Sequence, residues 1–85
     1  MEGDPTPEAI RAEILRLAGD RGADRSICPS EVARALAPEA WRPLMHRVRR
    51  EAAALATEGQ MEILRKGKPI APEAMHGVIR LRIAR

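Results

Sequence analysis

Two groups of side chains in this sequence have types and spacings that could do chemistry. The first is a lone thiol, Cys28, in the stretch Ser-Ile-Cys-Pro-Ser-Glu, directly before an apolar run with helical spacing. A helix N-terminus favours the thiolate form of a cysteine, which makes this residue a candidate nucleophile or redox sensor. The second group is a set of arginines and lysines in the second half of the chain, which indicates a polyanion as the partner.

The thiol also has a purely structural interpretation. Catalysis would need a base, and only His46 and His76 are available; neither is near Cys28 in sequence, and no second cysteine is present. Cys-Pro-Ser-Glu has the spacing of a capping box, with a thiol in place of a hydroxyl. We therefore expect Cys28 to begin a helix. We predict no enzyme activity and no catalytic residue, cofactor or metal site, because the two histidines are too far apart for a metal-ligand motif.

The charges are distributed unevenly along the chain. Residues 1–40 hold eight acidic side chains and five arginines, a net charge of −3, whereas residues 41–85 hold four acidic and ten basic side chains, a net charge of +6. A solvated surface rich in arginine would account for the total, but the separation of the two signs favours a basic face that meets a polyanion.

The composition indicates one small soluble domain. The chain has 85 residues and one aromatic residue, Trp41, so its core must rest on aliphatic side chains. We expect a disordered lead over residues 1–5 and a single domain over residues 6–85. The N-terminal residues lack the pattern of a signal peptide and no apolar run is long enough to span a bilayer, so we expect a cytoplasmic protein without a membrane partner.

Helical signals occupy the first two thirds of the chain. A cap residue followed by proline predicts a helix start at residues 6–7 and again at residues 28–29. The apolar spacing indicates three helices, over about residues 7–19, 29–36 and 42–58. Trp41 is expected to point toward the core with the apolar face of the third helix.

The remaining residues alternate between apolar and polar side chains, which predicts strands. The first strand would place Leu64 on the side opposite Met61 and Ile63, and the second begins near Ile79. The link over residues 66–77 is expected to protrude as a loop. Three helices followed by a two-stranded β-hairpin wing predict an α+β, mostly helical fold, namely a winged helix-turn-helix.

This architecture gives the basic residues a role. The outer face of the third helix would enter the major groove of double-stranded DNA, and the 66–77 wing would contact the backbone, as in a transcriptional regulator. An i,i+4 pair between Arg47 and Glu51 would occupy some of this charge. No small-molecule substrate is indicated. The predicted nucleic-acid-binding residues are Arg42, His46, Arg47, Arg49, Arg50, Lys66 and Lys68.

Four segments resemble the bacterial domain-of-unknown-function family 3253. They are ICPSEVARAL, WRPLMHRVRREAAALATEG, EILRKGKPI and GVIRLRIA, and the likeness extends from about Ile10 to Ile83. The resemblance implies a winged-helix fold and implies no established activity. Its markers are Trp41-Arg42, Pro43, Lys66-Gly67 and Arg80.

A second function remains open, that of a protein-interaction domain with a winged-helix shape and no DNA binding. Its basis is a smooth surface predicted from Ala53, Ala54, Leu64 and Met75. A DNA-binding monomer of this size would read only a short site, so useful specificity would require a homodimer or a partner protein.

Overall fold

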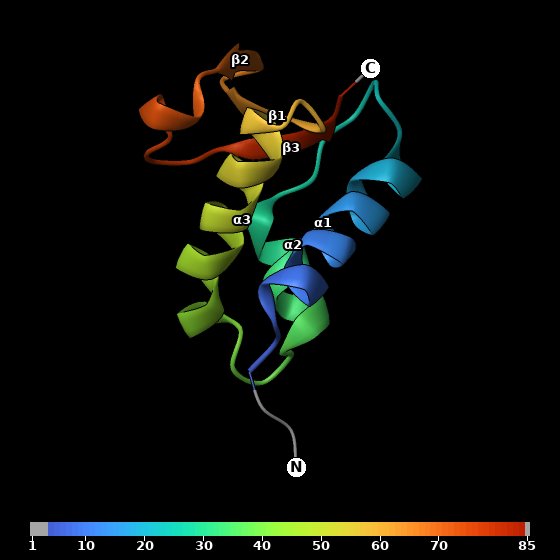
Figure 1. Ribbon diagram of the computed structural model, residues 1–85, viewed down its shortest axis with the longest axis vertical. Coiled ribbons are helices and arrows are strands. Elements are labelled where there is room, and N and C mark those ends of the chain that lie inside the picture. The colour runs from blue at the N-terminus through green and yellow to red at the C-terminus, as the bar shows by residue number, and fades with distance from the viewer. Residues whose placement is uncertain (1–3, 85) are drawn as a thin grey trace.

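The computed structural model describes residues 4–84 and has three helices followed by a small three-stranded antiparallel sheet (Figure 1). This confirms the predicted α+β, mostly helical, winged-helix-like fold. Residues 1–3 of the predicted lead lie outside the described part. Along residues 4–84, none of the helices has the length and apolar character of a membrane span. The elements are α1 (Pro7–Arg21), α2 (Pro29–Leu36), η1 (Arg42–Leu44), α3 (Met45–Thr57), β1 (Met61–Arg65), β2 (Lys68–Ile70), η2 (Pro72–Ala74) and β3 (Arg80–Ile83).

The helix α1 begins as its sequence predicts and ends later. The Thr6 hydroxyl accepts a hydrogen bond from the Ala9 amide at 3.0 Å, and Pro7 is the first helical residue. The helix passes through Gly19 and ends at Arg21, two residues beyond the prediction. Gly22, with φ of 94°, supplies the stop, because a positive φ is open to glycine at little cost.

The helix α2 has the predicted bounds and the predicted N-terminal residue, Cys28. The Glu31 carboxylate accepts a hydrogen bond from the Cys28 amide at 2.9 Å, which is the carboxylate half of a capping box. The thiol accepts a hydrogen bond from the Ser30 hydroxyl, with 3.1 Å between oxygen and sulfur. Partial burial opposes ionisation of Glu31, but hydrogen bonds from Cys28 and Arg21 outweigh it and lower the pKa of this carboxylate.

The third helix starts more gradually than predicted. Residues 42–44 form the 3-10 turn η1, closed by a 3.0 Å bond from the Leu44 amide to the Trp41 carbonyl, and the regular helix begins at Met45. Pro43 has no N–H and fits only the first turn of a helix. At the other end, Gly59 and Gln60 donate to the carbonyls of Ala56 and Leu55, which is a Schellman motif and ends the helix near the predicted position.

The sheet has one more strand than predicted. β1 lies in the centre and pairs antiparallel with β2 on one side and β3 on the other. The turn from β1 to β2 consists of Lys66 and Gly67, with φ of 54° and 82°, as a two-residue type I′ hairpin requires. The link over residues 66–77 is therefore not a simple protruding loop. Its first two residues already form a complete turn, and residues 68–70 continue as β2.

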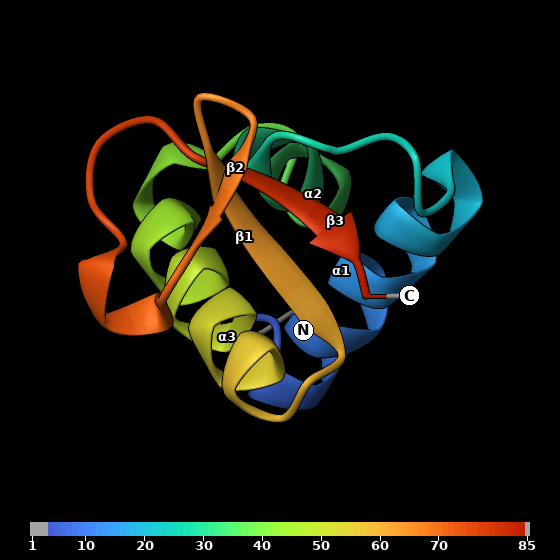
Figure 2. The same cartoon turned by 90° about the horizontal axis from the view of Figure 1, so that it is seen from above.

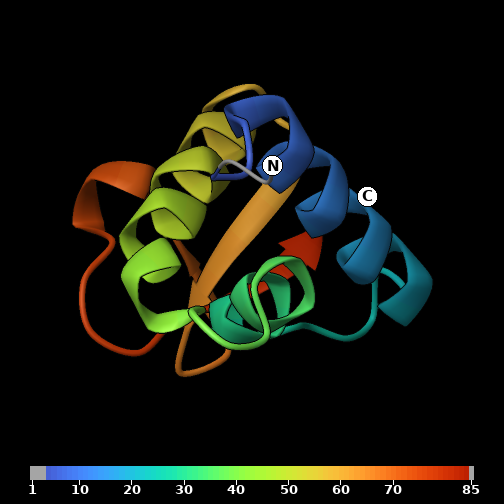
Figure 3. The same ribbon diagram turned by 90° about the horizontal axis from the view of Figure 1, so that it is seen from below.

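The helices cover one face of this sheet and leave the other uncovered. Seen from above, the strands lie in front of the helices (Figure 2). Seen from below, α1, α2 and α3 surround the sheet and cover its inner face (Figure 3). The fully buried core between these layers is aliphatic and includes Ile10, Ile14, Ile27, Val32, Val48, Leu55, Ile63 and Leu81.

Cys28→Ser is expected to preserve the fold and to change the free energy of unfolding by no more than about 1 kcal/mol, in the stabilising direction, because a hydroxyl caps a helix better than a thiol. Thermal denaturation followed by circular dichroism measures the change, and Ser30→Ala, which removes the hydroxyl bonded to the sulfur, is the matched control. A well-folded serine variant that lost a measurable catalytic activity would contradict the structural role of Cys28.

Candidate nucleic-acid interface

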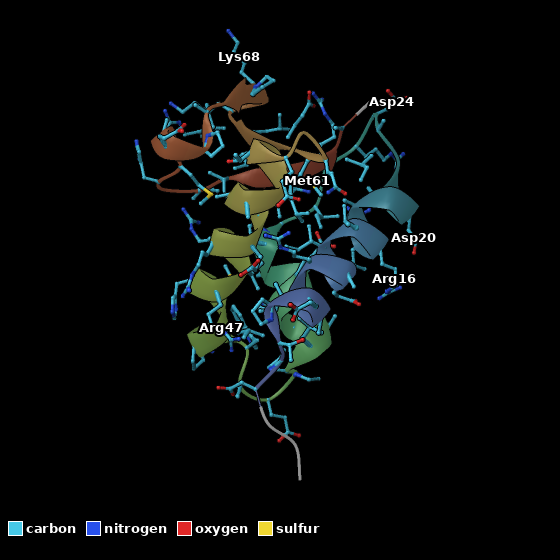
Figure 4. The ribbon with its side chains drawn as sticks, in the orientation of Figure 1. Arg16, Asp20, Asp24, Arg47, Met61 and Lys68 are labelled. Atoms are coloured by element: carbon cyan, nitrogen blue, oxygen red, sulfur yellow. The ribbon has the colours of Figure 1, made fainter. Side chains whose placement is uncertain are left out.

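The predicted binding residues divide into two groups in space. Five lie on η1 and α3, and the two lysines flank the tip of the β1–β2 hairpin. Figure 4 shows Arg47 toward the lower end of α3 and Lys68 at the top of the molecule. The structure thus separates a helical group from a hairpin group, as a recognition helix and a wing would be separated.

Two of the predicted arginines contact other parts of the chain. Arg47 Nη2 donates to the Pro5 carbonyl at 2.6 Å, and its Nη1 lies 3.9 Å from the Asp4 carboxylate. Arg49 Nη2 donates to the Gly77 carbonyl at 3.1 Å. The Arg47 side chain is 26% exposed. Both guanidinium groups are therefore held in place by backbone carbonyls from distant segments.

The predicted pair between Arg47 and Glu51 does not form. Glu51 instead accepts a 2.8 Å hydrogen bond from Arg11 Nε on α1, and Glu58 accepts one from Arg11 Nη1 at 3.0 Å. These bonds raise the pKa of Arg11 above its ordinary value, and the bond to Glu51 has the larger effect. Helix packing explains the correction, because Glu51 lies on the side of α3 that faces α1. The carboxylates of Glu51 on α3 and of Glu58, just after α3, thus share one guanidinium group from α1.

Four of the predicted residues have exposed side chains that make no hydrogen bond, ion pair or ring contact with any part of residues 4–84. Two of them lie on the outer ridge of α3, which also carries the half-buried Ala53 and the exposed Thr57. The other two lie at the hairpin tip, where Gly67 separates them. These four residues are His46, Arg50, Lys66 and Lys68.

Trp41 is only half-buried, which corrects the expectation that it points into the core with α3. The ring packs against the edge of the core and carries two guanidinium groups, Arg34 at 4.3 Å and Arg42 at 4.6 Å from its centroid. η1 explains the change, because a 3-10 turn does not continue the phase of the α-helix that follows it. Arg34, on α2, was missed, since nothing in its local sequence pairs it with Trp41.

The apolar surface expected from Ala53, Ala54, Leu64 and Met75 does not form as predicted. Leu64 is 6% exposed, and Ala53 and Met75 pack against the core. Leu64 lies between Pro69 on β2 and Arg80 on β3, and these neighbours cover it. The prediction lacked β2, which pairs with β1 beside Leu64.

The thiol of Cys28 contacts no histidine within residues 4–84. His76 lies beside Arg65, with 3.0 Å between its Nε2 and the guanidinium Nη1, and His46 is on the outer ridge of α3. Nor do any three histidine, cysteine or acidic side chains in this part of the chain lie together as a metal site would require.

Comparison with known protein families gives a match. Residues 7–84, nearly the whole chain, match a family that is described as Protein of unknown function (DUF3253). The chain belongs to the DUF3253 family. The match begins at the first residue of α1 and ends one residue after β3, so the DUF3253 unit is the complete helix-and-sheet domain. A search of curated proteins found no match to the chain.

Proposed function

We propose that this DUF3253 domain is a double-stranded DNA-binding module in which α3 enters the major groove and the hairpin contacts the phosphate backbone. The observation that supports it best is a set of four exposed side chains that make no hydrogen bond, ion pair or ring contact within residues 4–84, namely those of His46, Arg50, Lys66 and Lys68. They occupy the two elements that a winged helix uses on DNA.

The outer ridge of α3 suits a major groove. Arg50 lies near its centre and has five N–H donors that are free to pair with the edge of a guanine or with a phosphate. Ala53, one turn further on, is too small to hold the helix away from the base edges. Glu51, the acidic residue of α3, faces α1 and binds Arg11, so its carboxylate is turned away from this ridge.

The hairpin tip suits a backbone contact. Lys66 and Lys68 are both exposed and stand one on each side of Gly67. A lysine acts as a flexible point charge, which serves phosphate contacts better than base recognition. Their contribution is therefore expected to be independent of the DNA sequence.

The arginines with intramolecular contacts have a different proposed role. Arg42, Arg47 and Arg49 would border the DNA, and their links to Trp41, Pro5 and Gly77 would hold them in fixed positions. We assign no enzymatic step, cofactor or small-molecule substrate to this surface. Recognition of a specific site by a cytoplasmic regulator would require a homodimer or a partner protein, since one domain covers only a short site.

Replacing both hairpin lysines, as Lys66→Asn with Lys68→Gln, is expected to reduce the slope of log affinity against log salt by about 1–2, because each lost phosphate contact releases about one counterion fewer. Asparagine is chosen at position 66 because it tolerates the positive φ of that residue. Fluorescence anisotropy with a labelled duplex at several salt concentrations measures the slope.

The control for this experiment is Arg16→Gln. Arg16 is on α1 and points away from α3 (Figure 4). The substitution therefore removes a positive charge from the opposite side of the molecule. Its slope should remain that of the wild type. If the wild-type chain binds no duplex at about 50 mM salt up to roughly 10⁻⁴ M, which is the weak end of non-specific affinity, DNA binding is rejected.

A further inference from the structure

The outer face of the sheet, turned toward the viewer in Figure 2, carries an apolar groove that the proposed DNA contacts of α3 do not use. Met61 and Ile63 of β1 belong to the main core, whereas Leu64, on the alternate side of the strand, is buried apart from it. The groove encloses about 510 Å³, a volume within the usual range of ligand pockets. Its lining residues are Ser26, Leu64, Arg65, Lys66, Gly67, Val78 and Arg80.

Val78 gives this groove an exposed apolar wall. It is 86% exposed, while the other large apolar side chains of residues 4–84 are buried or half-buried. The next residue, Ile79, is 2% exposed, so the chain turns one branched side chain into the core and leaves the other in water. Covering Val78 and the accessible edge of Leu64 with an aliphatic side chain would be favourable, since burial of apolar surface stabilises a complex.

The rim of the groove is basic, and no acidic residue lines it. Two of the three cations are fixed in position. Arg80 Nε donates to the Ser26 hydroxyl at 2.7 Å and its Nη2 to the Ser26 carbonyl at 2.9 Å. Arg65 is held between the Ala74 carbonyl and the ring of His76. Lys66 is free, and all three would attract a carboxylate.

We propose that this groove binds an acidic peptide segment of a partner protein, with one aliphatic side chain seated between Leu64 and Val78. Carboxylates that flank this anchor would pair with Lys66 and Arg80. An acidic peptide fits better than a nucleic acid because the groove offers an apolar floor inside a basic rim, and a phosphate on that floor would lose its hydration without a hydrogen bond in return. The proposal does not require DNA binding, although Lys66 belongs to both proposed surfaces, so the peptide and DNA would compete for it.

The test uses the full chain labelled with ¹⁵N and ¹³C-methyl groups, observed by NMR during titration. The probes are short peptides rich in aspartate and glutamate with a single central leucine, isoleucine, valine or methionine. The control peptides carry serine at the centre. The expected result is that aliphatic-centred peptides shift the signals of Leu64 and Val78 and bind about tenfold more tightly than the serine controls, as burial of one side chain would give.

Two variants separate the contributions of the wall and the rim. Val78→Ser should weaken peptide binding about tenfold without altering the fold, because this side chain is exposed. Lys66→Asn should weaken peptide binding about threefold, with a larger effect at low salt, and asparagine should preserve the hairpin turn. Small aliphatic carboxylates, tested in parallel, should bind far more weakly than the peptides.

Three outcomes would overturn the proposal. The first is that no aliphatic-centred peptide binds with a dissociation constant below about 1 mM, because an affinity weaker than this is too low for useful recognition. The second is that serine-centred peptides bind equally well, which would reduce the groove to a charged surface. The third is that a double-stranded DNA shifts Leu64 and Val78 as strongly as the peptides do, which would make the groove part of a nucleic-acid surface.

Discussion

Leu81→Ala is expected to lower the free energy of unfolding by about 2–5 kcal/mol, the usual cost of removing most of a buried leucine. Leu81 is fully buried in β3. It lies opposite Ile63 of β1 and pairs with Ile27 on its other side. An alanine would leave a cavity between these two isoleucines. For a chain of this size, whose total stability is roughly 4–13 kcal/mol, the loss would be a large fraction of the whole.

Urea denaturation followed by circular dichroism and by the fluorescence of Trp41 measures this loss. Val78→Ala is the matched control, because it also shortens an aliphatic side chain near β3, but one that is 86% exposed. The control should change stability by less than about 0.5 kcal/mol. A loss below about 1 kcal/mol for Leu81→Ala would show that the site collapses around the smaller side chain, or that β3 is not packed as described.

Arg50→Ala is expected to weaken binding to a preferred DNA site by about 1–3 kcal/mol, or roughly 5- to 150-fold, and to weaken binding to random duplexes much less. Arg50 lies on the exposed ridge of α3, where it is positioned for a base edge. Its side chain is exposed and makes no hydrogen bond, ion pair or ring contact within residues 4–84, so stability should be unchanged. The preferred site is first selected from a randomised duplex pool, and both affinities are then measured by fluorescence anisotropy.

Arg16→Ala is the control, since it removes an arginine from α1 on the far side of the molecule (Figure 4). Equal losses on preferred and random duplexes would assign Arg50 to a phosphate instead of a base. A lower melting temperature for Arg50→Ala would assign it a structural role. Either result would contradict the expected base contact while leaving DNA binding itself intact.

The helix starts could be predicted from the sequence because their signals are local. Thr6 with Pro7, and Cys28 with Glu31, act within three residues of each other, and the hydrogen bonds they imply are present, at 3.0 Å and 2.9 Å. The apolar faces were also predictable, since Ile10 and Val48 follow helical spacing and are buried.

Two kinds of feature escaped prediction, namely a short turn within a longer link and contacts between distant segments. Leu64 is buried between β2 and β3, and β2 depends on a turn of two residues within the longer link. Arg47 contacts Pro5, 42 positions away in the chain. No local pattern encodes this contact. The predicted candidate site thus combines exposed side chains that have no partner within residues 4–84 with arginines that contact other segments of the fold.

The pairing of Ile27 with Leu81 has a consequence for the order of folding. Their amides and carbonyls exchange two hydrogen bonds of 2.8 Å, and the neighbouring bond from Arg80 to Ser26 spans 54 positions. The β1–β2 hairpin is local and can close within microseconds. The segment between α1 and α2, which includes Ile27, can pair only after β3 is present, and this pairing carries the entropy cost of closing a long loop. During synthesis the apolar faces of α1 and α2 therefore remain without the last strand until the end of the domain has emerged, and this is the interval in which the chain is most prone to aggregate.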